Sequence, residues 1–294
     1  MTTTQTNHVD LTPATYFWSG SSRAGEIAAL AKHGRHVGVA VDALDKGGRS
    51  LAELRKLSSS HVKVFVDSGA FGEVKFDASA GGFVDVRPIS DSDWLERLET
   101  YREIAKALGS RCYLVAPDKV GDQVVTLERL ARYAEQVNEL RELGANIIVP
   151  LQKGAMSQAA FDQAVTSTLG FGDYVRGIPS KKAAATVEEI AELCQELPAD
   201  ARIHLLGLGP WGARFDQVMA VVNRPAELVF CDSVRIKALV GRTNGRGGAP
   251  RILTALTDKA REVLGLADKG KLSADESFQV KFWALDTYLA HHAA

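Results

Sequence analysis

The stretch His61–Phe71, with the sequence HVKVFVDSGAF, decides the fold. Its run of mainly β-branched and aromatic residues ends at Asp67 and is followed at once by the small-residue turn Ser68-Gly69-Ala70. An apolar run this short, closed by a turn, predicts a buried strand. An aspartate at the end of such a strand either caps a helix, forms a turn or has a chemical role, because an unsatisfied buried carboxylate is costly.

The chain contains this kind of short apolar run eight times, and segments of helical periodicity alternate with most of the runs. The runs are mostly apolar on both faces, as buried parallel strands are. We predict strands at Tyr16–Ser19, His36–Val41, His61–Asp67, Arg111–Pro117, Asn146–Leu151, Asp173–Ile178, Arg202–Leu208 and Glu227–Cys231. Eight such strands predict an α/β fold, the closed (β/α)8 TIM barrel. An open doubly wound sheet is the alternative, and it is weakened because no Gly-x-Gly-x-x-Gly follows the first strand.

The domain organisation follows from the same pattern. Residues 15–294 are predicted to form one barrel domain with extra C-terminal helices over Asp258–Leu266 and Ala274–His291, after a polar, disordered lead-in at 1–14. Residues 72–88 interrupt the alternation after the third strand and predict a long loop or a small hairpin. Insertions of this length in a compact domain commonly carry function.

The composition limits the class of protein. The 294 residues are 46% hydrophobic and 24% charged, as in soluble globular proteins, and no segment approaches the ~20 apolar residues of a membrane span. Cys112, Cys194 and Cys231 lie far apart, which argues against a zinc ribbon or disulfide framework and suits a reducing cytoplasm. With a net charge of -1, any nucleic-acid binding must come from a local patch. We expect no metal and no cofactor.

The candidate chemistry lies at the strand ends, because active sites of (β/α)8 barrels form at the carboxyl ends of the strands. The residues at these ends are Ser19, Asp42, Asp67, Asp118, Gln152, Gly177, Gly209 and Asp232. No strand end carries a His-x-His pair, which argues against a metal-dependent hydrolase. Carboxylates around one opening repel, so at least one should have a raised pKa unless cations or substrate donors intervene. Paired carboxylates suit chemistry at a sugar carbon, and we expect Asp42 rather than the others to cap a helix.

A basic, glycine-rich segment follows the last strand. Residues 233–257 contain no Asp or Glu, and their cations are Arg235, Lys237, Arg242, Arg246 and Arg251. Guanidinium groups and free backbone donors at a barrel opening suit phosphate backbones, whereas the alternative is a solvated surface loop. Gly207-Leu208-Gly209 after the seventh strand either cradles a phosphate or allows close packing.

Several motifs, taken in order, resemble the tRNA-guanine transglycosylase family. Asp67–Phe71 (DSGAF) is similar to its DSGGF motif, and the similarity extends over roughly residues 65–248. The other matching segments are Ala116–Asp118 (APD), Pro150–Gly154 (PLQKG), Gly177–Ser180 (GIPS), Leu205–Gly209 (LLGLG), Cys231–Ser233 (CDS) and the loop Gly241–Gly248 (GRTNGRGG). Each motif alone is weak, but their order and strand-end positions are specific together.

The resemblance implies roles for these residues. Asp232 would be the nucleophile that attacks C1′ of a target guanosine, and Asp67 the general acid/base. Asp118 would read the edge of guanine or a 7-deazaguanine, with Gln152 and the Gly177 backbone on its carbonyl side. Ser68, Gly69 and Gly209 would complete the substrate site, and Arg235, Lys237, Arg242 and Arg246 would bind nucleic acid. A retaining double displacement needs two such carboxylates, and the target nucleotide must leave its stack.

Departures from the family pattern point to the substrate. Ala70, Gly72, Lys153 and Pro179 differ from the usual residues, and the Cys/His zinc site of the tRNA enzymes is absent. The chain thus looks more like the zinc-less, DpdA-type branch. That similarity predicts exchange of guanine in DNA for a free 7-deazaguanine base, with no cofactor, in the cytoplasm, without a membrane partner and with a homodimer as an allowed assembly.

Three other functions remain open. The first is base exchange in tRNA by the same mechanism. The second is hydrolysis of an N-glycosidic bond, which would keep the aspartates but would not need the basic loop. The third is a non-catalytic nucleic-acid-binding barrel, in which no covalent adduct would form.

Overall fold

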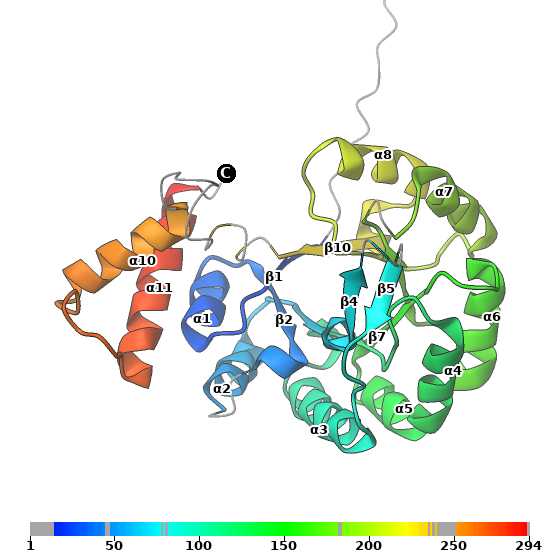
Figure 1. The fold of residues 1–294 in the computed structure, drawn as a ribbon, viewed down its shortest axis with the longest axis horizontal. Coiled ribbons are helices and arrows are strands. Elements are labelled where there is room, and N and C mark those ends of the chain that lie inside the picture. The colour runs from blue at the N-terminus through cyan, green and yellow to red at the C-terminus, as the bar shows by residue number, and fades with distance from the viewer. Residues whose placement is uncertain are drawn as a thin grey trace, which may run out of the picture.

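The computed structural model describes residues 15–44, 48–77, 79, 82–181, 184–234, 236, 239 and 251–292. Its central element is a barrel built from β1 (Thr15–Ser19), β2 (His36–Ala40), β3 (Val64–Asp67), β6 (Cys112–Val115), β7 (Asn146–Pro150), β8 (Val175–Pro179), β9 (Ile203–Leu206) and β10 (Val229–Ser233). The strands pair in parallel in the closed order β1-β10-β9-β8-β7-β6-β3-β2 (Figure 1). All eight coincide with predicted strands, and the predicted (β/α)8 barrel is confirmed. The lead-in predicted at 1–14 lies outside the described residues.

Helices alternate with the strands of the barrel, as the helical periodicity between the apolar runs predicted. They are α1 (Ala24–Lys32), α2 (Arg49–Lys56), α3 (Asp91–Leu108), α4 (Gln123–Arg132), α5 (Ala134–Glu142), α6 (Gln158–Leu169), α7 (Val187–Glu196) and α8 (Ala213–Val222). The helical segment between β6 and β7 is divided at Tyr133 into α4 and α5. Ser90 at the start of α3 and Thr186 at the start of α7 form capping boxes with the third helical residue, which fixes where these helices begin. Among the described residues, no helix has the length and apolarity that crossing a membrane requires.

The insertion after β3 is a small hairpin, which is one of the two structures predicted for residues 72–88. Its strands β4 (Val74–Asp77) and β5 (Gly82–Asp85) pair antiparallel. The short helix η3 (Ala70–Glu73) connects it directly to the carboxyl end of β3. In Figure 1 the hairpin is drawn in front of the barrel strands.

The interior of the barrel is filled by side chains at alternate strand positions. These residues form a cluster of their own, separate from the core between strands and helices: Phe17, Phe65, Tyr113, Val115, Ile148, Val175 and Phe230. Because side chains of a strand point to the same face every second residue, the position two residues after each lies in the next layer toward the carboxyl end. For three of these strands that position holds Ser19, Asp67 and Asp232. The apolar interior therefore supports a polar layer at the barrel opening.

Two further helices, α10 (Ile252–Val263) and α11 (Ala274–His291), extend the barrel on the side of α1 (Figure 1). The helix expected over 258–266 thus begins earlier, at Ile252. A Cβ atom added to Gly25 of α1 would lie 2.5 Å from the carbonyl oxygen of Phe278 in α11. Lys32 and His33 both bind the Asp286 carboxylate of α11, at 2.8 and 2.9 Å. The extension therefore packs tightly against the first helix of the barrel.

Gly25→Ala should destabilise the protein by about 1–3 kcal/mol, because the added methyl group must displace the α11 backbone. The higher helix propensity of alanine, worth about 1 kcal/mol, acts in the opposite direction. Gly270→Ala is the matched control, since its Cβ would meet nothing within 4 Å. Urea unfolding measures both, and equal stability of the two variants would show that this contact is not tight.

Candidate active site

Asp232, at the carboxyl end of β10, is buried and accepts hydrogen bonds on both carboxylate oxygens. Its Oδ2 accepts from the Ser19 hydroxyl at 2.9 Å, and Ser19 ends the neighbouring strand β1. Its Oδ1 accepts from the Gly207 amide at 2.8 Å and lies 3.2 Å from Nε2 of His204, both on the β9 side. The strands on either side of β10 therefore fix the candidate nucleophile in one orientation.

His204 is a residue that the sequence analysis missed. It has no metal-ligand spacing to another histidine or cysteine that would mark it in the sequence. The structure places it fully buried inside the barrel, in contact with Asp232 and with its ring near-parallel to those of Phe17 and Phe65. The signal was present in the alternation of β9, since His204 lies two residues before the inward-facing Leu206.

Among the described residues, Asp67 at the end of β3 has fewer hydrogen-bond donors around its carboxylate than Asp232 has. Burial raises its pKa from 3.8 to about 7, and the negative charges of Asp118 and Asp232 add to this shift. In the part of the chain that the structure describes, one hydrogen bond reaches its carboxylate, from the Gly69 amide at 3.4 Å. Near neutral pH a large fraction of the Asp67 carboxyl groups therefore keep their proton, and the protonated form is the one that a general acid requires.

Gly69 allows the turn after β3. Its φ of +73° favours glycine, and a Cβ there would lie 2.7 Å from the carboxylate of Asp42. The expectation that Asp42 caps a helix was wrong, because it lies within the short helix η1 (Val41–Ala43) and the N-cap of α2 is Gly48. Asp42 instead stands beside the turn that carries Asp67, and its charge is a further, smaller cause of the raised pKa of Asp67.

Asp118 follows β6 and forms a buried polar group with two other predicted site residues. Its Oδ1 accepts from the Ser68 hydroxyl at 2.7 Å and its Oδ2 from Nε2 of Gln152 at 2.9 Å. The Gly121 amide donates to Oε1 of Gln152 at 2.9 Å, which fixes the orientation of that side-chain amide. Burial raises the pKa of Asp118 to about 6, although the hydrogen bond from Ser68 opposes the shift. These three side chains could read the donor and acceptor pattern of a planar base.

The other two of the three predicted site glycines occupy tightly packed positions. A Cβ on Gly177 would lie 3.0 Å from Leu206 and 3.1 Å from Ile148, inside the barrel. A Cβ on Gly209 would lie 2.6 Å from the Ser233 hydroxyl and 2.8 Å from the Trp211 ring. Both positions therefore need glycine for close packing. The packing alternative for Gly209 is confirmed, and a phosphate contact there stays a prediction.

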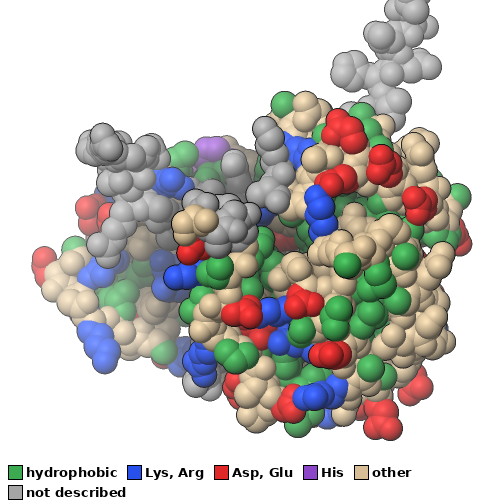
Figure 2. Space-filling model, turned by 45° about the vertical axis from the view of Figure 1, so that its right-hand side comes forward, with side chains coloured by type: hydrophobic (Ala, Val, Ile, Leu, Met, Phe, Trp, Pro, Cys, Tyr) green, Lys and Arg blue, Asp and Glu red, His purple; other side chains and the backbone are tan. Residues whose placement is uncertain are grey.

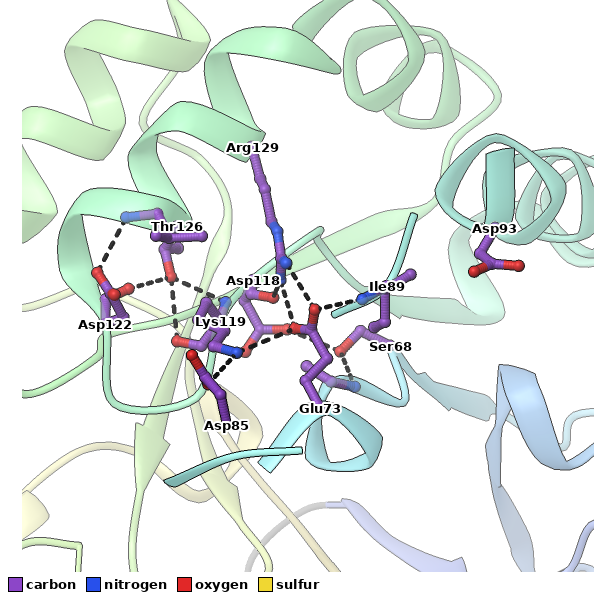
Figure 3. A network of polar contacts seen from close by, with 12 residues as sticks. Ser68, Glu73, Asp85, Ile89, Asp93, Asp118, Lys119, Asp122, Thr126 and Arg129 are labelled. Atoms are coloured by element: carbon purple, nitrogen blue, oxygen red, sulfur yellow. Dashed lines mark hydrogen bonds and ion pairs between the residues drawn. The ribbon is translucent and has the colours of Figure 1, made fainter. Parts of the chain in front are cut away.

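A buried ion pair connects Asp118 to the insertion after β3 (Figure 3). Glu73 is fully buried and accepts from both terminal nitrogens of Arg129 at 2.7 Å and from the Ile89 amide at 2.6 Å. Although burial opposes it, the hydrogen bond from Arg129 holds the pKa of Glu73 below its usual value. Arg129 also donates to the backbone carbonyl of Asp118. Nearby, Lys119 binds Asp85 of β5 at 2.6 Å and so ties the hairpin to the same turn.

A second guanidinium fixes the turn after β3 in a related way. Arg97 of α3 donates to the Ser68 carbonyl at 2.6 Å. The guanidinium groups of Arg97 and Arg129 each lie 5.2 Å from the ring centre of Trp94. The backbones that carry Ser68 and Asp118 are therefore both anchored by cations that share one buried indole.

A cavity of about 430 Å³ elsewhere in the molecule lacks these features. It lies between α7 and α8 and is lined by Cys194, Leu197, Val222 and neighbouring residues, without a carboxylate. Its one charged side chain, Arg224, donates to the carbonyls of Cys194, Leu197 and Pro198. The strand ends are therefore the better candidate site, because there the titratable groups converge.

The predictions on nucleic-acid-binding residues and on metal sites concern parts of the protein other than these strand ends. The predicted nucleic-acid-binding residues Arg235, Lys237, Arg242 and Arg246 lie outside the described residues. Within the described residues, no group of three or more His, Cys, Asp or Glu side chains is arranged to hold a metal ion. The face in Figure 2 carries acidic and basic side chains interspersed with hydrophobic ones.

Comparisons with known proteins assign no family to this chain. No family model and no curated protein matches the chain. A protein from Coccidioides immitis that is assigned as a fructose-1,6-biphosphate aldolase matches with a TM-score of 0.49 and 12% identity, over 95% of this chain and 89% of its own. Fructose-bisphosphate aldolase from Campylobacter jejuni (0.45, 10%, over 95% and 89%) and dihydrodipicolinate synthase from Bacillus clausii (0.38, 11%, over 88% and 99%) also match. At such identities these structures say nothing about what this chain acts on.

Glu73→Gln should destabilise the protein by about 3–5 kcal/mol, because it leaves the buried Arg129 charge without its carboxylate partner. Asp85→Asn is the control within the same network, since the Asp85 side chain is 76% exposed and its pair with Lys119 is worth at most about 1 kcal/mol. Denaturant unfolding of both variants measures the difference. Similar losses in the two would contradict the anchoring role of Glu73.

Asp67→Asn should stabilise the protein at alkaline pH. Between about pH 4 and 7 the folded protein keeps the Asp67 proton that the unfolded chain loses, so wild-type stability falls as pH rises through this window. An asparagine at this position does not titrate, so the variant does not lose this stability. Its free energy of unfolding should exceed that of wild type by about 2–4 kcal/mol at pH 8 and differ little from it at pH 4. Thermal unfolding at both pH values measures it.

Asp286→Asn is the control of opposite sign. Although burial opposes the shift, hydrogen bonds from Lys32 and His33 lower the pKa of Asp286. A lowered pKa contributes stability above the unfolded value, so this variant should lose stability at pH 8. If Asp67→Asn also loses stability at pH 8, burial does not destabilise the ionised Asp67 carboxylate, and the prediction is contradicted.

Proposed function

We propose that this protein is a transglycosylase that exchanges guanine in DNA for a free 7-deazaguanine base through a covalent glycosyl–Asp232 intermediate. The observation that carries the proposal is the contrast between two carboxyl groups at one barrel opening. Asp232 accepts hydrogen bonds on both oxygens, from Ser19 and Gly207, and its Oδ1 also lies 3.2 Å from Nε2 of His204. Asp67 has its pKa raised to about 7. Such a contrast suits a nucleophile paired with a general acid.

The first step forms the covalent intermediate. A carboxylate oxygen of Asp232 bonds to C1′ of the target nucleotide while the bond from C1′ to N9 of guanine breaks. The electron pair of that bond goes to the departing base, which takes the Asp67 proton. The burial that raises the pKa of Asp67 supports this role, because a carboxyl that holds its proton near neutral pH can donate it.

The second step restores the enzyme. The Asp67 carboxylate takes the N9 proton of the incoming 7-deazaguanine, and N9 then bonds to C1′ as the bond from C1′ to Asp232 breaks. Asp232 regains its negative charge and Asp67 its proton, so the cycle needs no other reactant. Each displacement inverts the configuration at C1′, so the two steps together retain the configuration of the sugar.

Recognition of the base would fall to Asp118, Gln152 and Ser68. Their side chains form a buried, hydrogen-bonded group next to Asp67, which supports a preformed base site. The Asp118 carboxylate would accept hydrogen bonds from donors on the edge of the base, beside the amide of Gln152 and the hydroxyl of Ser68. The target base must leave its stack to reach these groups, as in other enzymes that act on bases.

The choice of DNA rests on the sequence. The similarity of the motifs to the zinc-less branch of the transglycosylases and the absence of the Cys/His zinc site favour it. Arg235, Lys237, Arg242 and Arg246 would supply the phosphate contacts, and the loop that carries them follows Asp232 directly. A hydrolase acting on an N-glycosidic bond is the alternative that the same carboxylates would allow.

A base-exchange assay tests the proposal. Radiolabelled guanine is incubated with the protein and, separately, with duplex DNA, single-stranded DNA and tRNA. Label that enters DNA supports the proposal, and label that enters tRNA alone overturns the choice of DNA. If no label enters, a free 7-deazaguanine replaces guanine. Release of base without exchange would then indicate the hydrolase.

Asp232→Asn should abolish exchange, with a loss of at least ~10⁴-fold, because the amide cannot form the glycosyl ester. Asp67→Asn should also prevent turnover, since it removes the proton donor. Asp85→Asn, which changes an exposed carboxylate near the barrel opening, should keep wild-type activity. Exchange at the wild-type rate in either site variant would overturn the assignment.

A further inference from the structure

Resting on the proposed function, we infer that His204 is a positioning residue that, with the Gly207 amide, anchors Oδ1 of Asp232 and leaves Oδ2 to attack C1′. The two oxygens have different partners. Oδ1 lies 2.8 Å from the Gly207 nitrogen and 3.2 Å from Nε2 of His204, whereas Oδ2 accepts only from the Ser19 hydroxyl among the described residues. A hydroxyl can rotate away during reaction, but a backbone amide and a packed ring cannot.

The tautomer of His204 follows from its contacts. Oδ1 of a carboxylate is an acceptor, so Nε2 must carry the hydrogen that it shares. Nδ1 is buried and, within the described residues, has no hydrogen-bond partner. A lone pair at that position leaves one unpaired acceptor, whereas an N–H would leave an unpaired donor and also remove the bond to Asp232. His204 therefore donates from Nε2.

The ring is held in place by its neighbours. The ring centres of Phe17 and Phe65 lie 5.8 and 4.7 Å from that of His204, at interplanar angles of 18° and 19°. The side chain is fully buried, so a rotation would require the barrel interior to repack. The donor is thus fixed before substrate arrives.

This arrangement should act mainly on the second step of the exchange. When the bond from C1′ to Oδ2 breaks, the electron pair enters the Asp232 carboxylate and negative charge grows on Oδ1. Donors fixed at Oδ1 stabilise that charge without reorganising. In the first step the same donors already stabilise the ground-state carboxylate, so they do little to lower the barrier of that step. Loss of the His204 donor should therefore slow breakdown of the intermediate more than its formation.

Two substitutions of His204 test this role. His204→Phe keeps a planar ring but removes the donor, and His204→Gln keeps an amide N–H that can reach Oδ1. The Phe variant should exchange base roughly 10²-fold more slowly while a larger fraction of the enzyme carries the covalent oligonucleotide adduct. The Gln variant should recover most of the rate. Gel shift after denaturation and intact mass measure the adduct, and thermal unfolding checks that both variants fold.

The outcomes separate this inference from the proposed function. A Phe variant with wild-type rate, or with a slower rate but no accumulated adduct, overturns the role of His204. If wild-type protein forms no adduct and exchanges no base, the proposed function fails instead. Imidazole ¹⁵N NMR then still decides the contact: a hydrogen on Nε2 whose signal shifts in Asp232→Asn supports it, and a hydrogen on Nδ1 overturns it.

Discussion

Closure of eight parallel strands into a barrel fixes which side chain of each strand faces the interior, and the candidate site depends on this constraint. Once Phe17, Phe65 and Phe230 fill the interior, the positions two residues later must face the opening. These positions hold Ser19, Asp67 and Asp232. A shift of one residue in any strand would turn its polar residue toward the helices. The packing of the interior therefore also sets the geometry of the chemistry.

Within that polar layer, the surrounding donors decide what each carboxyl group can do. Burial without compensation favours the protonated form, whereas fixed donors favour the carboxylate. Asp67 has one long hydrogen bond and Asp118 has two short ones from side chains, yet burial raises the pKa of both. Asp232 accepts a hydrogen bond on each carboxylate oxygen, from donors on the strands on either side of β10. Three acids of one residue type thus lie in different hydrogen-bond surroundings that their neighbours set.

Much of the fold could be predicted from the sequence, and less of the site. Short apolar strands report burial on both faces, so all eight strand positions were found, and the motif residues at their ends do converge. Contacts across the barrel leave no local trace, however. His204 carries no spacing signal, and its role depends on which residues of β9 face inward. Asp42 looked like a helix cap because its contact with the Gly69 turn is a tertiary one.

The insertion after β3 shows why the rest could not be predicted. Its sequence is polar and glycine-rich, which indicates only a loop or hairpin. The structure makes it part of the site, because the buried Glu73 binds Arg129, whose guanidinium also anchors the Asp118 backbone. An unpaired charge at either position would cost several kcal/mol, so each residue is compatible with the folded structure only when the other is present. Their separation in sequence hides this pair, yet through it the insertion, α4 and the end of β6 hold the hydrogen-bonded group of Ser68, Asp118 and Gln152 as one unit.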